Sequence, residues 1–469
     1  MQHNHEIRSK EDLLDHFGSS KKLEIGNQQQ MKDLLKMNIP PEVWEDASKR
    51  NLLSFNLELL QQKKEFLFYR RGIQYFHLLQ FLTDLTELNL SGNKISDISS
   101  ISKIRTLETL DLSDNCIEDI STLQSFSDLI YLTELDLSGN KISDISSISK
   151  IKNLKKLDLG SNYIDDISAL QSLPDLTHLN LSENILTTYT ITLPNLLDLN
   201  ISTQYIGMKY SNINKLQDIS GLQHSPKLQK LNLYNTETTD LHITPPQLFG
   251  LKDLSLYKNN FIEISYLSNF VDLQILSLSE NKQLQNIGPL KFCTQLTELY
   301  IFETNVSDIW PLQFMKNLKA LYMNSTKVVD LHPLQHLYQL ESISASYSCI
   351  IDVSPLSNLT ELNDLTVSCS KITNGDALKH HKNFSKYDFS NQKVPTTDDL
   401  KFYNKILKVH NSHKQIRTIQ NQNRIQRIRT SLTLKKNVVE TILDNYARKM
   451  NTQLEILAYF IESSNTQLQ

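Results

Sequence analysis

The hydrophobic positions of this chain follow one pattern, LxxLxLxxN, which returns at a nearly constant interval. It is clearest as LTELNLSGN over residues 85–93, and it returns as LETLDLSDN, LTELDLSGN, LKKLDLGSN and LTHLNLSEN at steps of 22, 25, 22 and 22 residues. A fixed period in this range predicts a solenoid, in which each repeat is one structural unit. Less regular copies continue the pattern, and we count 14 units between about residues 82 and 395.

Alternation inside each repeat predicts a short β-strand with two different faces. Leu88 and Leu90 are expected to point inward, whereas Glu87, Asn89 and Ser91 point outward. One repeat cannot bury its own leucines, so neighbouring repeats must stack and complete a continuous core. The strands are therefore expected to form one parallel sheet along a concave side.

The asparagine that ends each repeat is expected to hydrogen-bond backbone groups of the turn, which would otherwise be buried without partners. Later repeats carry a hydroxyl residue here instead, at Thr304, Thr326, Ser348 and Ser370. A hydroxyl replaces only part of the amide, so we expect these repeats to be less firmly tied. Prolines that suit the first turn of a short convex helix recur in the same region, at Pro289, Pro311, Pro333 and Pro355.

These motifs resemble the leucine-rich repeat in its 22-residue class. The repeat tails, such as ISDI at 95–98 and IDDI at 164–167, are similar to those of the internalin family and of the leucine-rich regulatory subunit of type 1 protein phosphatase. The resemblance implies an α/β solenoid, a horseshoe with a concave parallel sheet and short convex helices or turns. It also implies a non-enzymatic scaffold or regulatory adaptor that binds another protein in its concave face, or alternatively an internalin-like receptor-binding ligand.

The outward positions of the predicted sheet change character along the solenoid. In the early repeats they are small or acidic, and Asp111, Asp136 and Asp158 either attract a basic partner or keep the surface soluble. In the middle and later repeats they become aromatic, at Tyr234, Tyr257, Tyr300, Phe302 and Tyr322. Clustered tyrosine on a solvent-facing sheet is typical of interfaces, so we expect a protein-binding patch there; the alternative is that the rings only cover a thin sheet.

The chain divides into a flank over residues 1–80, the solenoid over 81–396 and a tail over 397–469. In the first flank we expect helices over 11–17, 28–37 and 41–62, which either cap the end of the solenoid or bind a small partner. Within the solenoid, residues 201–227 contain about 10 residues more than one repeat needs. Both a loop insertion and a decayed repeat explain this excess.

The tail differs from the solenoid in charge. Residues 398–469 hold 12 Lys and Arg against 6 Asp and Glu, a net charge of +6, whereas residues 1–397 carry −10. We expect basic or amphipathic helices here, which cap the solenoid, contact a nucleic acid or membrane surface, or bind a calmodulin-type protein. A nucleic acid or membrane surface is the less favoured partner, because the repeats supply no basic field to match.

One pattern in the tail resembles the IQ motif, IQxxxRGxxxRxxL, of calmodulin-binding proteins. The matching positions are Ile419, Gln420, Arg424, Arg429 and Leu432. Ile425 stands where the motif has a glycine. The resemblance implies a basic amphipathic helix that binds in the groove of an EF-hand protein.

No catalytic or cofactor motif accompanies the repeats. The chain has no glycine-rich phosphate loop and no nucleophile elbow, and it contains only 11 glycines. Asp330, His332 and His336 come nearest to a metal-binding set, but Pro333 interrupts the helix that this spacing would need. We therefore expect no enzyme activity, no cofactor and no metal.

Cysteine usage and hydropathy indicate the compartment. The four cysteines show no paired spacing and are expected as small buried residues, at Cys116, Cys293, Cys349 and Cys369. The N-terminal residues lack the apolar stretch of a secretory signal, and no apolar run approaches the length of a membrane span. We therefore expect a monomeric, cytoplasmic protein.

Overall fold

The computed structural model divides the chain into two compact units, Met1–Leu251 and Lys252–Gln469. Because they are separate units, each is described by itself. The structure describes residues 22–24, 44–47, 52–56, 65–67, 85–99, 101, 104–203, 214–241, 250–378, 381, 386–390 and 393.

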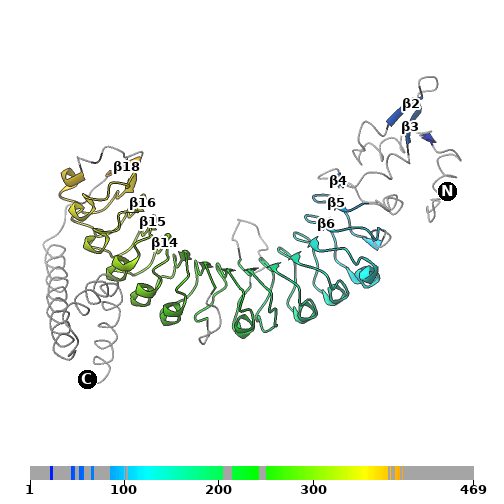
Figure 1. The fold of residues 1–469 in the computed structure, drawn as a ribbon, viewed down its shortest axis with the longest axis horizontal. Coiled ribbons are helices and arrows are strands. Elements are labelled where there is room, and N and C mark those ends of the chain that lie inside the picture. Colours follow the sequence, from blue (N-terminus) through cyan, green and yellow to red (C-terminus); the bar gives the residue numbers. More distant parts are fainter. Residues whose placement is uncertain are drawn as a thin grey trace, which may run out of the picture. The chain divides into compact units, whose positions relative to one another are not determined.

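The first unit contains a ladder of parallel strands, one for each repeat (Figure 1). The strands are β4 Glu65–Leu67, β5 Glu87–Asn89, β6 Thr109–Asp111, β7 Glu134–Asp136, β8 Lys156–Asp158, β9 His178–Asn180, β10 Asp198–Asn200 and β11 Lys230–Asn232. Each strand pairs in register with the next, so equivalent residues of successive repeats lie side by side. The ladder includes β4, one strand more than the sequence predicts, because 65–67 pairs with β5 at the same 22-residue offset.

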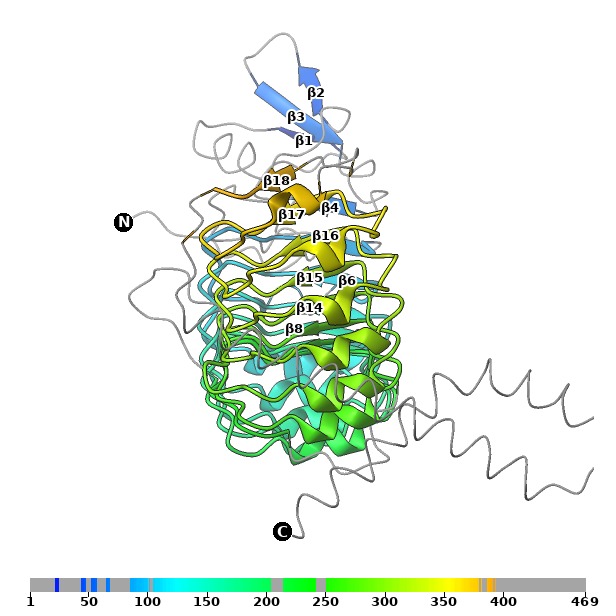
Figure 2. The ribbon, with the colours of Figure 1, turned by 90° about the vertical axis from the view of Figure 1, so that its left-hand side faces the viewer.

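The second unit repeats this arrangement. Its strands are β12 Asp253–Ser255, β13 Ile275–Ser277, β14 Glu298–Tyr300, β15 Ala320–Tyr322, β16 Ser342–Ser344, β17 Asp364–Thr366 and β18 Lys386–Asp388. All pair in parallel with their neighbours. Seen along the stack in Figure 2, the strands lie on one side of each coil and the short helices lie on the other.

The leucines of the repeat form the core, as the pattern predicts. Leu88 and Leu90 are 1% and 0% exposed, and the equivalent residues of the later repeats are buried in the same way. Ser91 is an exception to the predicted alternation, because it is buried, and its hydroxyl and backbone N–H both donate to Asn89 Oδ1. The strand ends at this position, so the side chain turns back towards its own strand.

The helical segments opposite the strands are 3-10 helices. In the first unit they are η4 Ser121–Asp128, η5 Ser146–Lys150, η6 Ser168–Ser172 and η7 Ser220–His224. In the second unit they are η8 Ser265–Asn269, η9 Gly288–Phe292, η10 Trp310–Phe314, η11 His332–Leu334, η12 Ser354–Leu356 and η13 Gly375–Leu378. The four predicted prolines each lie in the first turn of a helix, η9 to η12, which confirms that prediction.

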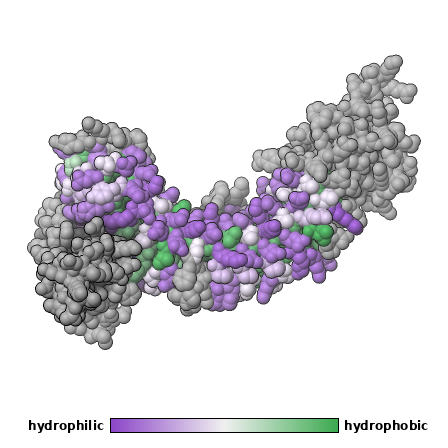
Figure 3. Space-filling view, viewed as in Figure 1, coloured by the Kyte–Doolittle hydropathy of each residue, from purple (hydrophilic) through white to green (hydrophobic). Residues whose placement is uncertain are grey.

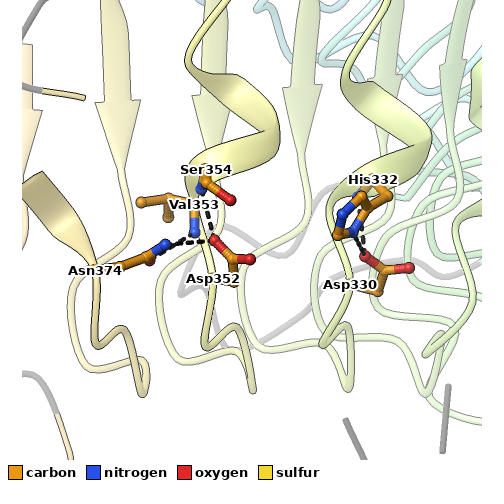
Figure 4. Close-up of polar contacts among 6 residues, drawn as sticks. All are labelled: Asp330, His332, Asp352, Val353, Ser354 and Asn374. Carbon is orange, nitrogen blue, oxygen red and sulfur yellow. Dashed lines mark hydrogen bonds and ion pairs between the residues drawn. The ribbon is translucent and has the colours of Figure 1, made fainter. Parts of the chain in front are cut away.

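An aspartate before each of several helices explains the Asp-Ile tail of the repeat. Asp352 Oδ1 accepts hydrogen bonds from the Ser354 backbone N–H at 2.7 Å and from Asn374 Nδ2 at 2.5 Å (Figure 4). Asn374 Oδ1 in turn accepts the Val353 N–H at 3.1 Å. The carboxylate therefore satisfies a backbone donor at the start of a helical turn, as an N-terminal cap does.

The asparagine ladder ties each repeat to the previous one. Asn162 is fully buried, and its Nδ2 donates to Leu159 O in its own repeat at 3.1 Å and to Leu137 O in the previous repeat at 3.0 Å. Its Oδ1 accepts the Ile142 N–H of the previous repeat at 3.0 Å. Thr304 and Thr326 retain only the bond inside the repeat, from Oγ1 to Ile301 O and to Met323 O respectively. The predicted weaker tie therefore has a structural basis at Thr304 and Thr326, whereas Ser348 and Ser370 keep contacts between repeats, with their Oγ atoms 3.0 Å apart and Ser370 Oγ donating to Ala345 O at 3.3 Å.

In the irregular stretch, the ladder position is not where the spacing predicts it. The regular interval from Asn200 falls on Gln204, but Asn214 takes the ladder role, with Nδ2 donating to Leu181 O and Ile201 O, both at 2.9 Å. Asn214 Oδ1 accepts the Leu186 N–H at 2.9 Å. The ladder position has therefore moved to residue 214, which favours the insertion over the decayed repeat; residues 204–213 lie outside the described residues.

The helix predicted over residues 41–62 is wrong. Strands β2 Trp44–Ala47 and β3 Leu52–Asn56 occupy this segment and pair antiparallel, with β1 Lys22–Glu24 on the other side of β3. Cross-strand pairing, locally between β2 and β3 and over a longer stretch of chain between β1 and β3, has overridden the helical pattern. The helices predicted over 11–17 and 28–37 lie outside the described residues, as does the tail over 397–469.

Candidate binding surface

Strands β14 and β15 place two tyrosine rings against each other on the solvent side of the sheet. Tyr300 and Tyr322 are the last residues of these strands and pair directly in the ladder. Their ring centroids lie 4.6 Å apart with an angle of 3° between the planes, so the rings are stacked. This separation equals the spacing of neighbouring strands, about 4.8 Å, so the sheet itself brings the rings together.

A second ring pair lies two residues further along the repeats. Tyr257 and Phe302 follow strands β12 and β14, and their centroids are 5.5 Å apart at an angle of 55°. The equivalent residue after the strand between them is Ser279, which is buried and accepts the Phe302 N–H on its Oγ at 3.1 Å. Because this residue is small, the two rings meet across the intervening repeat.

Carboxylates hold the hydroxyl groups of two of these tyrosines. Tyr300 Oη donates to Glu298 Oε2 at 2.7 Å, and Tyr257 Oη donates to Glu280 Oε1. Burial, followed by the Glu298 carboxylate, raises the pKa of Tyr300, so its hydroxyl stays protonated. The sequence reasoning missed both glutamates. Glu298 could have been found, since residues two apart in a strand share a face.

The structure therefore brings together four of the five predicted aromatic residues. We call Tyr257, Tyr300, Phe302 and Tyr322 the aromatic cluster; all four side chains are partly exposed. Tyr234 belongs to the first unit, where its backbone N–H donates to Asn232 Oδ1 at 3.0 Å. The alternative reading, that the rings pack on one another, agrees with the two ring pairs but leaves their exposed edges without a role.

The acidic residues of the early repeats form a row on the first unit. The ladder pairs Asp111 with Asp136 and Asp136 with Asp158. The carboxylates at the ends of the row accept hydrogen bonds from amides, since Asn89 Nδ2 donates to Asp111 Oδ2 at 2.6 Å and Asn180 Nδ2 donates to both Asp158 oxygens at 2.9 Å. Asp136, in the centre, has carboxylates on both sides.

The central position of Asp136 in this row changes the pKa of its carboxyl group. Burial, opposed by hydrogen bonds from Ser138 and reinforced by Asp158 and Asp111, raises the pKa of Asp136 to about 6. Two like charges on adjacent strands disfavour the ionised form, as does partial removal of water. The row is thus an electrostatically strained part of the sheet.

The histidines that came nearest to a metal set have other partners. His332 Nδ1 lies 2.6 Å from Asp330 Oδ1, which also accepts the His332 backbone N–H at 2.9 Å (Figure 4). His336 Nδ1 lies 3.1 Å from Tyr338 Oη. Over the described ranges, no group of three or more His, Cys, Asp or Glu residues is arranged to hold a metal ion.

The cysteines differ in part from the prediction that all four are buried. Cys293 is buried, with Sγ 3.2 Å from Leu267 O, and burial raises the pKa of its thiol to about 12. Cys116, in contrast, is exposed, and Cys349 and Cys369 are partly exposed. These three lie next to the ladder position, on turns at the surface, whereas Cys293 closes a 3-10 helix.

The IQ-like motif stays a prediction, because its positions lie outside the described residues; they are Ile419, Gln420, Arg424, Arg429 and Leu432.

Within the part of the chain that the structure describes, no helix has both the length and the apolar character that a membrane span needs. On the side of the molecule that Figure 3 shows, the described surface is largely hydrophilic with small, separate hydrophobic areas.

Comparison with known proteins agrees with the geometry of the repeats. The family model for leucine-rich repeats (2 copies) matches residues 82–129, 132–172 and 152–195. No curated protein sequence matches the chain.

Solved structures share the fold. A leucine-rich repeat protein of Leptospira interrogans aligns with a TM-score of 0.62 and 19% identity, over 75% of this chain and 95% of that one. A chain from the Toll–Spätzle complex of Drosophila aligns with a TM-score of 0.53 and 19% identity, over 68% of this chain and 45% of that one. The internalin InlF of Listeria monocytogenes is 24% identical over 74% of this chain and 86% of its own, with a TM-score of 0.47. Residues 82–129 and 132–195 of the chain are therefore leucine-rich repeats, and the described strands have the fold of a leucine-rich repeat solenoid.

Proposed function

We propose that the protein is a non-enzymatic scaffold that binds another protein on the sheet face of its second unit. Leucine-rich repeat solenoids in general present such a face to other proteins. The observation that carries the proposal is the aromatic cluster, four partly exposed rings in two pairs on a face that the fold does not need to cover. Tyrosine is enriched at the energetic centres of protein interfaces.

The cluster is suited to binding because its rings are held in place before a partner arrives. Tyr300 is fixed by the stack on Tyr322 and by the bond to Glu298, and Tyr257 is fixed by Phe302 and Glu280. A side chain that is already ordered loses little conformational entropy on binding, which otherwise costs about 0.5–1.5 kcal/mol for each flexible side chain. The rings therefore offer a rigid contact area.

The finer role, a regulatory adaptor that docks a partner enzyme, follows from the resemblance to the phosphatase subunit. Its support is that the parallel strands of the second unit provide a single extended sheet face. Under this reading the chain positions a partner and leaves the chemistry to it. Function is argued from sites and not from fold, so the aromatic cluster is the part to test.

The test compares three versions of the full chain as bait in an extract of the source cells. The first is unchanged, the second carries Tyr257→Ser, Tyr300→Ser and Tyr322→Ser, and the third is a matched control. The control carries the same change at three exposed tyrosines away from the sheet face, Tyr131, Tyr163 and Tyr338, which are 56%, 44% and 55% exposed.

A partner held by the unchanged chain and by the control, but lost by the cluster variant, is the expected result. Thermal melting of all three versions checks that the fold survives. A partner that stays on the cluster variant would show that the sheet face of the second unit is not the binding surface.

A further inference from the structure

The charged residues inside the strands that carry the aromatic cluster all have one sign, while Lys252, Lys258 and Lys319 lie just beyond the strand ends. Strands β12 to β17 contain no Lys or Arg, and their charged residues are Asp253, Glu298 and Asp364. These three occupy equivalent positions in the ladder, in the row that runs through Ile275, Ala320 and Ser342. A partner that lies along this face meets an anionic row beside an aromatic one.

Small side chains flank the stacked pair in the ladder, and on one side Ser344 Oγ donates to Asn324 Oδ1 at 2.9 Å. In the ladder, Tyr300 is flanked by Tyr322 on one side and by Ser277 on the other, and Tyr322 is flanked by Ser344. Each ring covers one face of the other, so the second face of each borders a small side chain. A flat group of a partner can therefore continue the stack over Ser277 or over Ser344.

The two sides are not equivalent in charge. On the Ser277 side, Glu298 and Asp253 lie two strands apart, roughly 10 Å, with β13 between them. Glu298 already accepts Tyr300 Oη, but a carboxylate has about four acceptor sites, so it can take further donors. On the Ser344 side, the nearest carboxylate of this row is Asp364 on β17, with Ser342 on β16 in between.

We propose that the sheet face of the second unit recognises a polypeptide segment bearing arginine, whose guanidinium stacks on Tyr300 over β13 between Glu298 and Asp253. This rests on the proposed function and names the chemistry of its partner. Arginine fits better than lysine, because its planar fork stacks on aromatic faces and donates to carboxylates in pairs.

The probes are fluorescein-labelled 12-residue peptides, (Gly-Ser-Arg) four times, with Lys or Gln in place of Arg in two further peptides. Binding to the full chain is measured by fluorescence anisotropy at low and moderate salt. The site variant is Asp253→Asn with Glu298→Gln, in which the amide oxygen of Gln can still accept Tyr300 Oη. The matched control is Asp364→Asn, which removes a charge from the same row away from the Ser277 side.

We expect the Arg peptide to bind at least tenfold more tightly than the Gln peptide and several-fold more tightly than the Lys peptide. The site variant should weaken the Arg peptide about tenfold, and the control should change it less than twofold. Equal binding of Arg and Gln peptides, or equal loss in the site variant and the control, would overturn the inference. Dimerisation of the chain that needs Tyr300 and that the Arg peptide does not reduce, seen by light scattering, would also overturn it, because a second copy would then be the occupant.

These results separate the inference from the proposed function. If the cluster variant loses its cellular partner while the Arg peptide binds no better than the Gln peptide, the scaffold function stands and the arginine chemistry fails. If the cellular partner stays on the cluster variant, the scaffold function in this location fails.

Discussion

Replacing Asn162 by threonine converts one rung of the asparagine ladder into the form that the later repeats already use. The asparagine is fully buried and bridges two repeats through Leu137 O and Ile142 N. A threonine keeps the bond to Leu159 O, as Thr304 does to Ile301 O. The substitution therefore removes the bonds between repeats and preserves the bond within the repeat.

The magnitude follows from these lost partners. The Ile142 N–H becomes a buried donor without an acceptor, which costs about 1–3 kcal/mol, and the lost bond to Leu137 O adds about 0.5–1.5 kcal/mol. We expect the free energy of unfolding of the affected repeats to fall by about 2–4 kcal/mol. In a solenoid each repeat contacts only its neighbours, so the loss should be concentrated around residues 132–184.

Hydrogen exchange followed by mass spectrometry measures this locally, and urea denaturation followed by circular dichroism measures it for the chain. Peptides that contain Ile142 should exchange about 30-fold faster or more, while peptides of the second unit should be unchanged.

The reciprocal change, Thr326→Asn, should add a bond to the Val306 N–H and slow exchange there by roughly fivefold, about 1 kcal/mol.

The control is Asn153→Thr, the same change at an exposed asparagine whose Nδ2 also bridges repeats, to Ile130 O at 2.5 Å. It should cost less than about 1 kcal/mol, because water replaces the lost partner. If Asn162→Thr costs no more than Asn153→Thr, burial of the ladder is not what gives these bonds their value, and the reasoning is refuted.

Three further predictions concern the same repeats. Asp136→Asn should stabilise the chain by about 1–2 kcal/mol at pH 7.5 and by little at pH 4. The folded-state pKa of Asp136, about 6, lies above the ordinary value, so the unchanged protein is fully stable at low pH and loses this stability as the pH rises through 6. Melting temperatures of the two proteins that run parallel across this pH range would contradict this. Leu157→Asp should unfold its repeats, at a cost above about 4 kcal/mol, since Leu157 is 2% exposed and would become a buried unpaired charge; unchanged melting would refute the strand assignment. Asp352→Ala should cost about 1 kcal/mol, measured by urea denaturation, through loss of the hydrogen bonds that Asp352 accepts from the Ser354 N–H and from Asn374 Nδ2, and Asp352→Asn should cost less because its amide oxygen can still accept.

Much of the fold follows from local pattern. The alternation around Leu88 and Leu90 determines the strand and its inward face, and the 22-residue period determines that equivalent residues pair. The prolines of η9 to η12 likewise mark the start of each convex helix. These features were predictable because the same sequence pattern recurs from repeat to repeat and no other pattern competes with it within the solenoid.

The site was predictable only in outline. Outward positions in a strand are countable, so Tyr257, Tyr300, Phe302 and Tyr322 could be identified as surface residues of one face. The pairing of Tyr257 with Phe302, which skips a repeat, depends on the small Ser279 between them and on how far each ring reaches. Distances between side chains of different repeats are not contained in the spacing of either.

The remaining features belong to the tertiary structure alone. Asn214 takes the ladder position that the spacing assigns to Gln204, because the folded chain brings its amide to Leu181 O although it lies further along the sequence. The raised pKa of Asp136 arises from burial and from carboxylates 22 and 25 residues away that the sheet places on adjacent strands. Strands β2 and β3 form in a segment with a helical sequence pattern because they pair with each other. Local sequence determines which way a residue faces, whereas hydrogen-bond partners, electric fields and strand pairing depend on what folding brings alongside it.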